Sequence, residues 1–304
     1  MRGRRAALSR LAFSFGLVAL ILWWIDAAGA VARLRQAEGG WLLLAALLLT
    51  VQTVLMALRW RLTAAQLGLA IPRRRAVGEY YLAQAVNMTL PGGVLGDAAR
   101  AVRSRAEAGF GTAALAVMIE RLAGQAAMFA VATAGFGLAL LRPGGIGWPA
   151  GTGAILLAAV ALAILLPLLA RRLPVSATFA RAVRTALLAR AVWPRQAALA
   201  LVVVALNLAA CARATGTRLG PEAATTLVPL VLTAMLVPVS VAGWGWREGA
   251  AALLFPLAGA TAAAGVAASL AFGAIALAAS LPGLLWPVLS GWIERDLPQR
   301  ETGR

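Results

Sequence analysis

The stretch that decides the fold reads Leu90-Pro91-Gly92-Gly93-Val94-Leu95-Gly96-Asp97, and a second of similar character reads Val237-Pro238-Val239-Ser240-Val241-Ala242-Gly243-Trp244-Gly245-Trp246-Arg247-Glu248. Both interrupt apolar runs with proline and glycine, and both place ionisable residues beside backbone that cannot continue a helix. At bilayer depth, irregular backbone and charge are tolerated only where protein buries them or where they line a wet cavity. The two breaks therefore predict where a binding site lies.

The rest of the chain has the composition of a polytopic membrane protein. Of its 304 residues, 62% are apolar and 13% are charged, and the mean hydropathy is +0.84, whereas soluble proteins average about 25% charged residues. Runs that approach the ~20 apolar residues needed to cross a bilayer cover 11–26, 41–58, 112–141, 150–170, 196–212, 226–242 and 263–289. We predict an all-α membrane bundle of about seven or eight membrane segments, forming one domain over 1–304 with a membrane core at 10–290 and a polar tail at 291–304.

Several classes of chemistry are excluded by residue types that the chain lacks. It contains no histidine and a single cysteine, Cys211, which rules out a Ser-His-Asp triad, a histidine metal site and an internal disulfide. All 28 basic residues are arginines, so a phosphate-binding loop that needs lysine is also excluded. We expect no enzyme activity, no metal and no other cofactor.

The arginines also predict orientation. The N-terminus, residues 59–75 and residues 171–195 carry four, five and six arginines, whereas residues 28–40, 142–149 and 213–225 carry two, one and two. The positive-inside rule then places the N-terminus in the cytoplasm. We expect the protein in the plasma (inner) membrane, and we prefer the first run as an uncleaved span over a signal peptide. Arginines scattered between apolar runs do not form a nucleic-acid surface. We interpret the tryptophans at run ends as interfacial anchors, namely Trp41, Trp60, Trp148, Trp193 and Trp292.

Two segments do not fit as simple spans. Residues 76–96 are polar and have arginines on both flanks, which favours a re-entrant hairpin, and residues 243–262 either cross or return in the same way. Pro91 with Gly96 and Pro238 with Gly243 share one spacing, which is typical of two repeated halves but also arises by chance.

The first break has the chemistry of an anion site. The glycines allow backbone N–H groups to face a ligand, and Asp97 can cap or begin the following helix. Arg100 could bind phosphate there, or it could simply pair with Asp97 on a solvated helix face.

The second break and the long run at 112–141 contain further charges that need partners. Arg247 suits phosphate, and the alternative is a structural Arg247–Glu248 pair that locks two helices together. Glu120 and Arg121 point about 100° apart on a helix and must find partners elsewhere, such as Arg247 for Glu120 and Asp97 for Arg121. The substrate-binding residues predicted from the two breaks and this run are Asn87, Pro91, Gly92, Gly93, Gly96, Asp97, Arg100, Glu120, Arg121, Gly243, Gly245, Arg247 and Glu248.

These motifs, together with Arg59-Trp60, resemble the lysylphosphatidylglycerol synthase transmembrane (flippase-like) family over roughly residues 10–290. The resemblance implies a helical bundle with two re-entrant elements around a lipid-accessible cavity, and movement of polar lipid headgroups between leaflets. It also implies a stand-alone member, because no aminoacyl-transferase domain follows the last run. For Arg59, an interfacial position is favoured over a phosphate contact.

Three functions follow as hypotheses. The first is a flippase that moves a polar phospholipid or lipid-linked substrate. The second is a non-transporting scaffold of a lipid or glycan-lipid pathway, whose partners are other pathway proteins. The third is a membrane-embedded lipid transferase with Asp97 or Glu248 as base, which the absence of an acidic metal-binding cluster disfavours.

Overall fold

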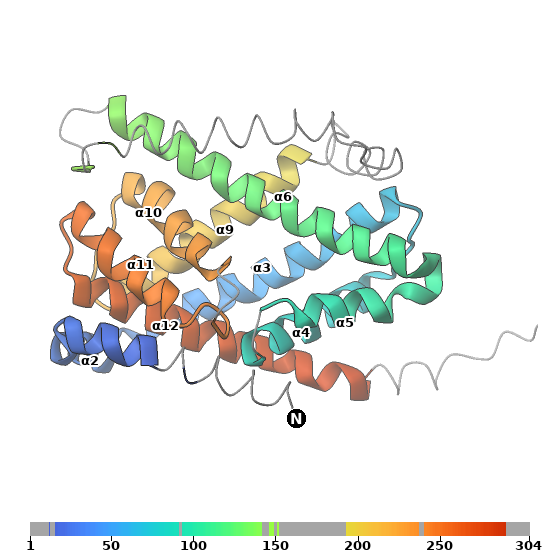
Figure 1. Ribbon diagram of the computed structural model, residues 1–304, viewed down its shortest axis with the longest axis horizontal. Coiled ribbons are helices and arrows are strands. Elements are labelled where there is room, and N and C mark those ends of the chain that lie inside the picture. Colours follow the sequence, from blue (N-terminus) through green and yellow to red (C-terminus); the bar gives the residue numbers. More distant parts are fainter. Residues whose placement is uncertain are drawn as a thin grey trace, which may run out of the picture.

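The computed structural model describes residues 12, 16–90, 93–141, 146–148, 151, 193–236 and 240–289. All regular elements in these ranges are helices (Figure 1), as predicted. Several predicted features lie outside the described residues. They are the predicted run 150–170 apart from residue 151, the arginine-rich segment 171–192, residues 91–92, the tail 291–304, Pro238, Trp292 and the arginines before residue 11.

Long apolar helices form the frame of the molecule. The segments Gly39–Gln66, Ala108–Ala139 and Ala262–Leu289 are long and apolar enough to cross a bilayer. They correspond to α3 (Gly39–Gln66), most of α6 (Arg105–Leu141), and α12 (Ala262–Ser280) with its extension η3 (Leu281–Leu285). A fourth long helix, α9 (Trp193–Ala214), packs against α3 and α12. The chain is therefore a polytopic helical membrane protein.

The segment around the first break forms a helical hairpin. α4 (Arg73–Thr89) is followed by Leu90, whose extended backbone suits the residue before a proline, and α5 (Leu95–Arg103) runs back along α4. Gly96 is required there, because a Cβ atom would overlap the carbonyl of Ala83. At the open end of the hairpin, Arg103 binds Glu79 at 2.5 Å.

The second break forms a hairpin too, and here the predicted continuous run 226–242 is wrong. α10 (Pro221–Thr233) passes into η1 (Ala234–Leu236), and after a turn the chain forms α11 (Trp246–Leu254) and η2 (Phe255–Ala258). Gly243 and Gly245 have φ angles of 78° and 91°, which favour glycine. With nine residues, α11 is about 14 Å long and too short to cross a bilayer.

The N-terminal run is bent instead of straight. A helix over Gly16–Trp24 meets α2 (Ala27–Arg35) at 103°. Asp26 caps α2 by accepting the Gly29 N–H at 2.9 Å. The expected loop over 28–40 is thus largely helical, because this cap begins a new helix immediately after the bend.

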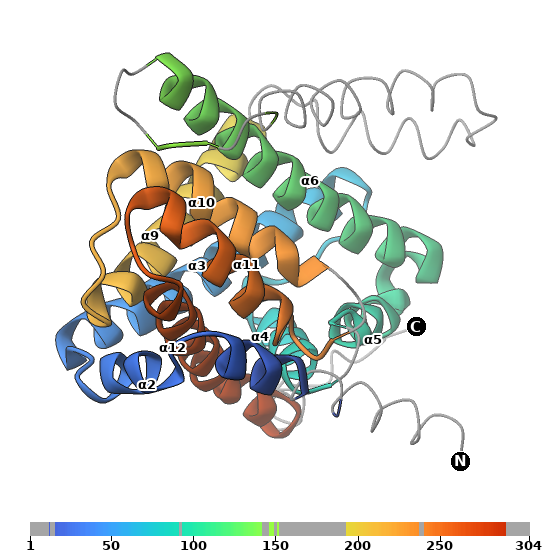
Figure 2. The same ribbon diagram turned by 60° about the vertical axis from the view of Figure 1, so that its left-hand side comes forward.

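The two hairpins occupy opposite ends of the bundle. The start of α3 lies beside the end of α9, where the Glu38 N–H donates to the Ala214 carbonyl, and α10 begins a few residues later. The other end of α3, about 42 Å away for its 28 residues, leads into α4. Figures 1 and 2 show this arrangement, with α10 and α11 on one side of the molecule and α4 and α5 on the other.

Candidate functional site

A cavity of about 290 Å³ lies between the two hairpins. Helices α3, α4 and α6 supply most of its wall, while Gly93 and Asp97 come from the first hairpin and Met235 and Ala242 come from the second. Its polar side chains all come from α3, α4, α5 and α6, which also supply apolar residues, whereas α9, α10 and α12 contribute apolar residues alone. The polar side chains form the polar wall of the cavity.

Glu120 on α6 is one centre of the polar wall. Its Oε1 accepts from Arg59 Nε at 3.1 Å and Arg59 Nη2 at 2.5 Å, and it lies 3.4 Å from the Tyr80 hydroxyl. Its Oε2 lies 3.5 Å from Arg100 Nη2. Arg59 is buried, with only 5% of its surface exposed, yet its Nη1 has no hydrogen-bond partner among the described residues. The prediction that Arg59 lies at the interface is wrong, because α3 continues past it to Gln66 and buries it against α6.

Asp97 on α5 is the other centre. Its Oδ1 accepts from Arg100 Nη2 at 2.7 Å, and its Oδ2 accepts from Asn87 Nδ2 at 2.9 Å and from Arg121 Nη2. Arg121 also donates to the Gly93 carbonyl at 3.0 Å, which joins α6 to the tip of the hairpin. The Asp97–Arg121 pair anticipated from sequence is therefore formed.

Arg100 joins the two carboxylates from beneath the cavity. It is fully buried, and its guanidinium carbon lies 4.4 Å from the ring centres of both Trp60 and Tyr80. Stacking on two aromatic faces stabilises a buried cation. Arg100 is thus neither on a solvated helix face nor in the cavity wall, and Trp60 is wholly buried instead of interfacial.

The cluster carries an excess of positive charge. Three arginines, Arg59, Arg100 and Arg121, share two carboxylates. Burying an ion costs several kcal/mol unless opposite charge compensates it, and one positive charge here has no counterpart among the described neighbours. Arg121, whose side chain is 37% exposed, and Arg59 both line the cavity. The polar wall is therefore suited to a single anionic group.

The second break does not contribute charge to the cavity. Arg247 and Glu248 are fully buried and pair at 2.6 Å, and Ser269 on α12 binds both of them. Glu248 also accepts the Gly245 N–H at 2.7 Å, which fixes the start of α11. Arg247 pairs with Glu248 and not with Glu120 as suggested above, so the alternative of a structural pair fits the geometry.

The structure thus divides the predicted residues into groups. Asn87, Gly93, Asp97, Glu120 and Arg121 line the cavity. Arg100 lies behind the wall, and Gly96 is used for packing, with its N–H donated to Asn87 Oδ1 at 2.8 Å. Outside the cavity lie Gly243, Gly245, Arg247 and Glu248, while Pro91 and Gly92 lie outside the described residues.

Some residues that line the central cavity were not predicted from the sequence, because no motif marks them. Gln52 and Gln125 lie in long apolar helices, where an isolated amide gives no motif. Gln52 accepts a hydrogen bond from Asn207 on α9 at 2.7 Å, and Gln84 lies 2.9 Å from the Thr53 hydroxyl. The available indication was that polar residues inside apolar runs usually face the interior of a helical bundle or a water-filled cavity.

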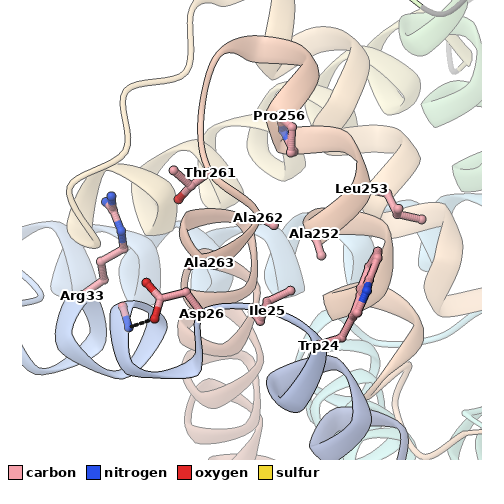
Figure 3. A pocket seen from close by; sticks show the side chains of 11 residues that line it. Trp24, Ile25, Asp26, Arg33, Ala252, Leu253, Pro256, Thr261, Ala262 and Ala263 are labelled. Carbon is pink, nitrogen blue, oxygen red and sulfur yellow. Dashed lines mark hydrogen bonds between the residues drawn. The ribbon is translucent and has the colours of Figure 1, made fainter.

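A second cavity, of about 590 Å³, lies in the elbow between the N-terminal helices and the start of α12. Figure 3 shows that Asp26 turns back onto its own helix, where it accepts the Gly29 N–H, while Arg33 lies apart from it. Arg33 donates to the Thr215 carbonyl at 3.4 Å. The carboxylate of Asp26 already serves as a helix cap, and most of the residues that line this cavity are apolar. This cavity is therefore a weaker candidate than the central one.

Comparison with known proteins gives one match. A family model described as the lysylphosphatidylglycerol synthase TM region matches residues 10–283. No curated protein and no solved structure matches the chain.

Proposed function

Because the chain belongs to the lysylphosphatidylglycerol synthase transmembrane family, we propose that it moves a phosphate-bearing lipid, or a lipid-linked substrate, between the leaflets of the plasma (inner) membrane. The observation that carries this proposal is the uncompensated positive charge beside the central cavity. Arginine matches phosphate oxygens with its planar fork of charged donors. The headgroup would bind Arg121 and Arg59, while Asp97 and Glu120 hold these arginines in place when the site is empty.

The placement of the cavity supports transport as well as binding. We interpret the α4–α5 and α10–α11 hairpins as re-entrant elements that approach from opposite leaflets, with their tips at the cavity. Each hairpin returns through a nine-residue helix whose third residue is acidic, Asp97 in α5 and Glu248 in α11. Such pairs are typical of transporters built from inverted repeats, in which the substrate binds where the repeats meet. The arginine-rich end would face the cytoplasm, the side on which arginine sorting also predicts the N-terminus.

The alternative hypotheses are less well supported by this geometry. A transferase would need Asp97 or Glu248 as a free base, yet arginines hold both carboxylates. A scaffold for other proteins of a lipid pathway does not require a charged cavity, and it becomes the preferred function if the cavity charges are dispensable.

A scrambling assay with fluorescent phosphatidylglycerol in proteoliposomes tests the proposal. Arg121→Gln removes a charged contact worth about 1.5–3 kcal/mol, so we expect the translocation rate to fall roughly 10- to 100-fold. Arg105→Gln, the same change at an exposed position that does not line the cavity, is the matched control and should keep the native rate. Equal rates for both variants and the native protein would overturn the transport proposal and favour the scaffold.

A further inference from the structure

A groove of about 780 Å³ runs along the outside of the α4–α5 end of the molecule. It is bounded by α3, α4 and the end of α12 with η3, and Figure 1 shows α4 lying beside this end of α12. α4 separates the groove from the central cavity, because Tyr80, Gln84 and Asn87 face the cavity whereas Val77 and Tyr81 face the groove. The two sites therefore lie on opposite faces of one helix.

The groove is charged at one end and apolar along its length. Arg73 and Arg74 are exposed at the start of α4, and they are the charged side chains among the described residues that line it. The positive end of the α4 dipole adds to their field. Leu58, Pro282 and Leu289 are among the apolar lining residues.

The walls of the groove are held in place by contacts of their own. Trp286 packs against Gly78, where a Cβ atom would overlap the indole ring, and its Nε1 lies 3.4 Å from Glu79. The Tyr81 hydroxyl lies 3.4 Å from the Thr50 carbonyl, which joins α4 to α3. The nearby carboxylate of Glu79 is buried and binds Arg103 at 2.5 Å, so it does not neutralise the two arginines at the rim.

We propose that this groove is a docking site for one anionic phospholipid from the leaflet at the arginine-rich end of the molecule. Its phosphate binds Arg73 and Arg74, and an acyl chain lies along the apolar part between α3 and α12. Charge complementarity selects this occupant, because the rim presents two cations and the trough below it is apolar. The site is distinct from the central cavity, and it does not depend on the proposed transport.

Native mass spectrometry of the delipidated protein, titrated with phosphatidylglycerol or phosphatidylcholine of the same chain length, tests the site. Each arginine near an anionic lipid contributes about fivefold in affinity, so Arg73→Gln/Arg74→Gln should weaken phosphatidylglycerol binding roughly 30-fold. Arg213→Gln/Arg218→Gln removes the same charge from exposed residues at the opposite end and should bind as the native protein does. Equal loss in both double variants, or no loss in the first, would overturn the proposal.

Two further variants distinguish lipid binding in the groove from lipid binding in the central cavity and from nonspecific attraction to surface charge. Thr50→Trp introduces a bulky ring at an exposed lining position, and without changing any charge it should lower the number of phosphatidylglycerol molecules bound at saturation by one, the groove lipid. Arg121→Gln weakens only the lipid proposed for the central cavity, so combining it with Thr50→Trp should lower the number further. An unchanged lipid number in Thr50→Trp, no difference between Arg121→Gln and the combined variant, or equally good replacement by phosphatidylcholine contradicts the groove site.

Discussion

At the scale of single residues, the molecule uses its buried arginines in two different ways. Arg247 and Glu248 form an ion pair that Ser269 bridges, and the indole of Trp244 and the ring of Phe272 lie 5.1 and 5.4 Å from the guanidinium carbon. Around the central cavity, in contrast, arginines outnumber carboxylates. A closed pair of equal and opposite charges stabilises a packing arrangement, whereas a cluster with excess positive charge that lines a cavity can accept an anionic ligand.

The closed pair makes a prediction about stability. Arg247→Gln leaves Glu248 as an uncompensated buried charge, so the free energy of unfolding should fall by about 3–5 kcal/mol. Arg247→Gln/Glu248→Gln removes both charges and should cost clearly less than the sum of the two single changes. Unfolding of the purified variants in mixed micelles, followed by tryptophan fluorescence, measures the coupling. Strict additivity would show that the two side chains do not act as a pair.

At the scale of elements, the α4–α5 hairpin depends on close backbone approach. Gly96 lets α5 lie against α4, and the Gly96 N–H donated to Asn87 ties the tip of the hairpin to the preceding helix. This approach places Asp97 where Asn87, Arg100 and Arg121 all reach it. The hairpin therefore positions one of the two carboxylates that organise the cavity.

Gly96→Ala should disturb the hairpin because its methyl group meets backbone that cannot move aside. We expect a loss of roughly 1–3 kcal/mol in unfolding free energy, the usual cost of overpacking, and a lower rate of lipid translocation in the folded protein. Gly111→Ala in α6 is the matched control, since none of the described residues elsewhere in the fold lies within 4 Å of the added methyl group. It should be neutral or up to about 1 kcal/mol stabilising, because alanine favours helix. Thermal unfolding of the two variants measures the effect. The same shift in melting temperature for both would refute this account of Gly96.

At the scale of the whole molecule, long helices carry the two hairpins at opposite ends. The segment 59–75 lies at the α4–α5 end, and the segment 213–220 lies at the α10 end. Arginine sorting predicts that the first of these ends is cytoplasmic. The central cavity then lies between elements that belong to different sides of the membrane.

Cysteine labelling checks this orientation. Arg74→Cys and Arg218→Cys place thiols at exposed positions of the two ends, whereas the native Cys211 is buried. In intact spheroplasts, we expect a membrane-impermeant maleimide to modify the introduced cysteine of the Arg218→Cys variant only. After lysis, the reagent should modify the introduced cysteine of both variants. The unmodified parent protein serves as the background control. Modification of the Arg74→Cys variant in intact spheroplasts would reverse the proposed orientation.

Local patterns in the sequence were enough to predict the class of the protein and the location of its irregular segments. Three features could be identified without knowing the fold: apolar runs of membrane length, the arginines between them, and the proline and glycine residues at 90–96 and 237–245. Each acts locally, through hydrogen bonding and backbone geometry. They predicted the α3, α6 and α12 spans and the turn before Asp97. They did not predict the bend after Trp24 or the early end of α10, because both depend on how short helices pack.

Which charged side chains meet depends on how the helices pack, and local patterns do not show this. Both breaks carry acidic and basic residues, yet Asp97 joins Arg100 and Arg121 at a cavity while Glu248 is closed off by Arg247. Arg59, Gln52 and Gln125 join the site from distant helices. The physical reason is that a buried ion pair is set by the relative position and rotation of packed helices, which depend on contacts between residues far apart in the chain.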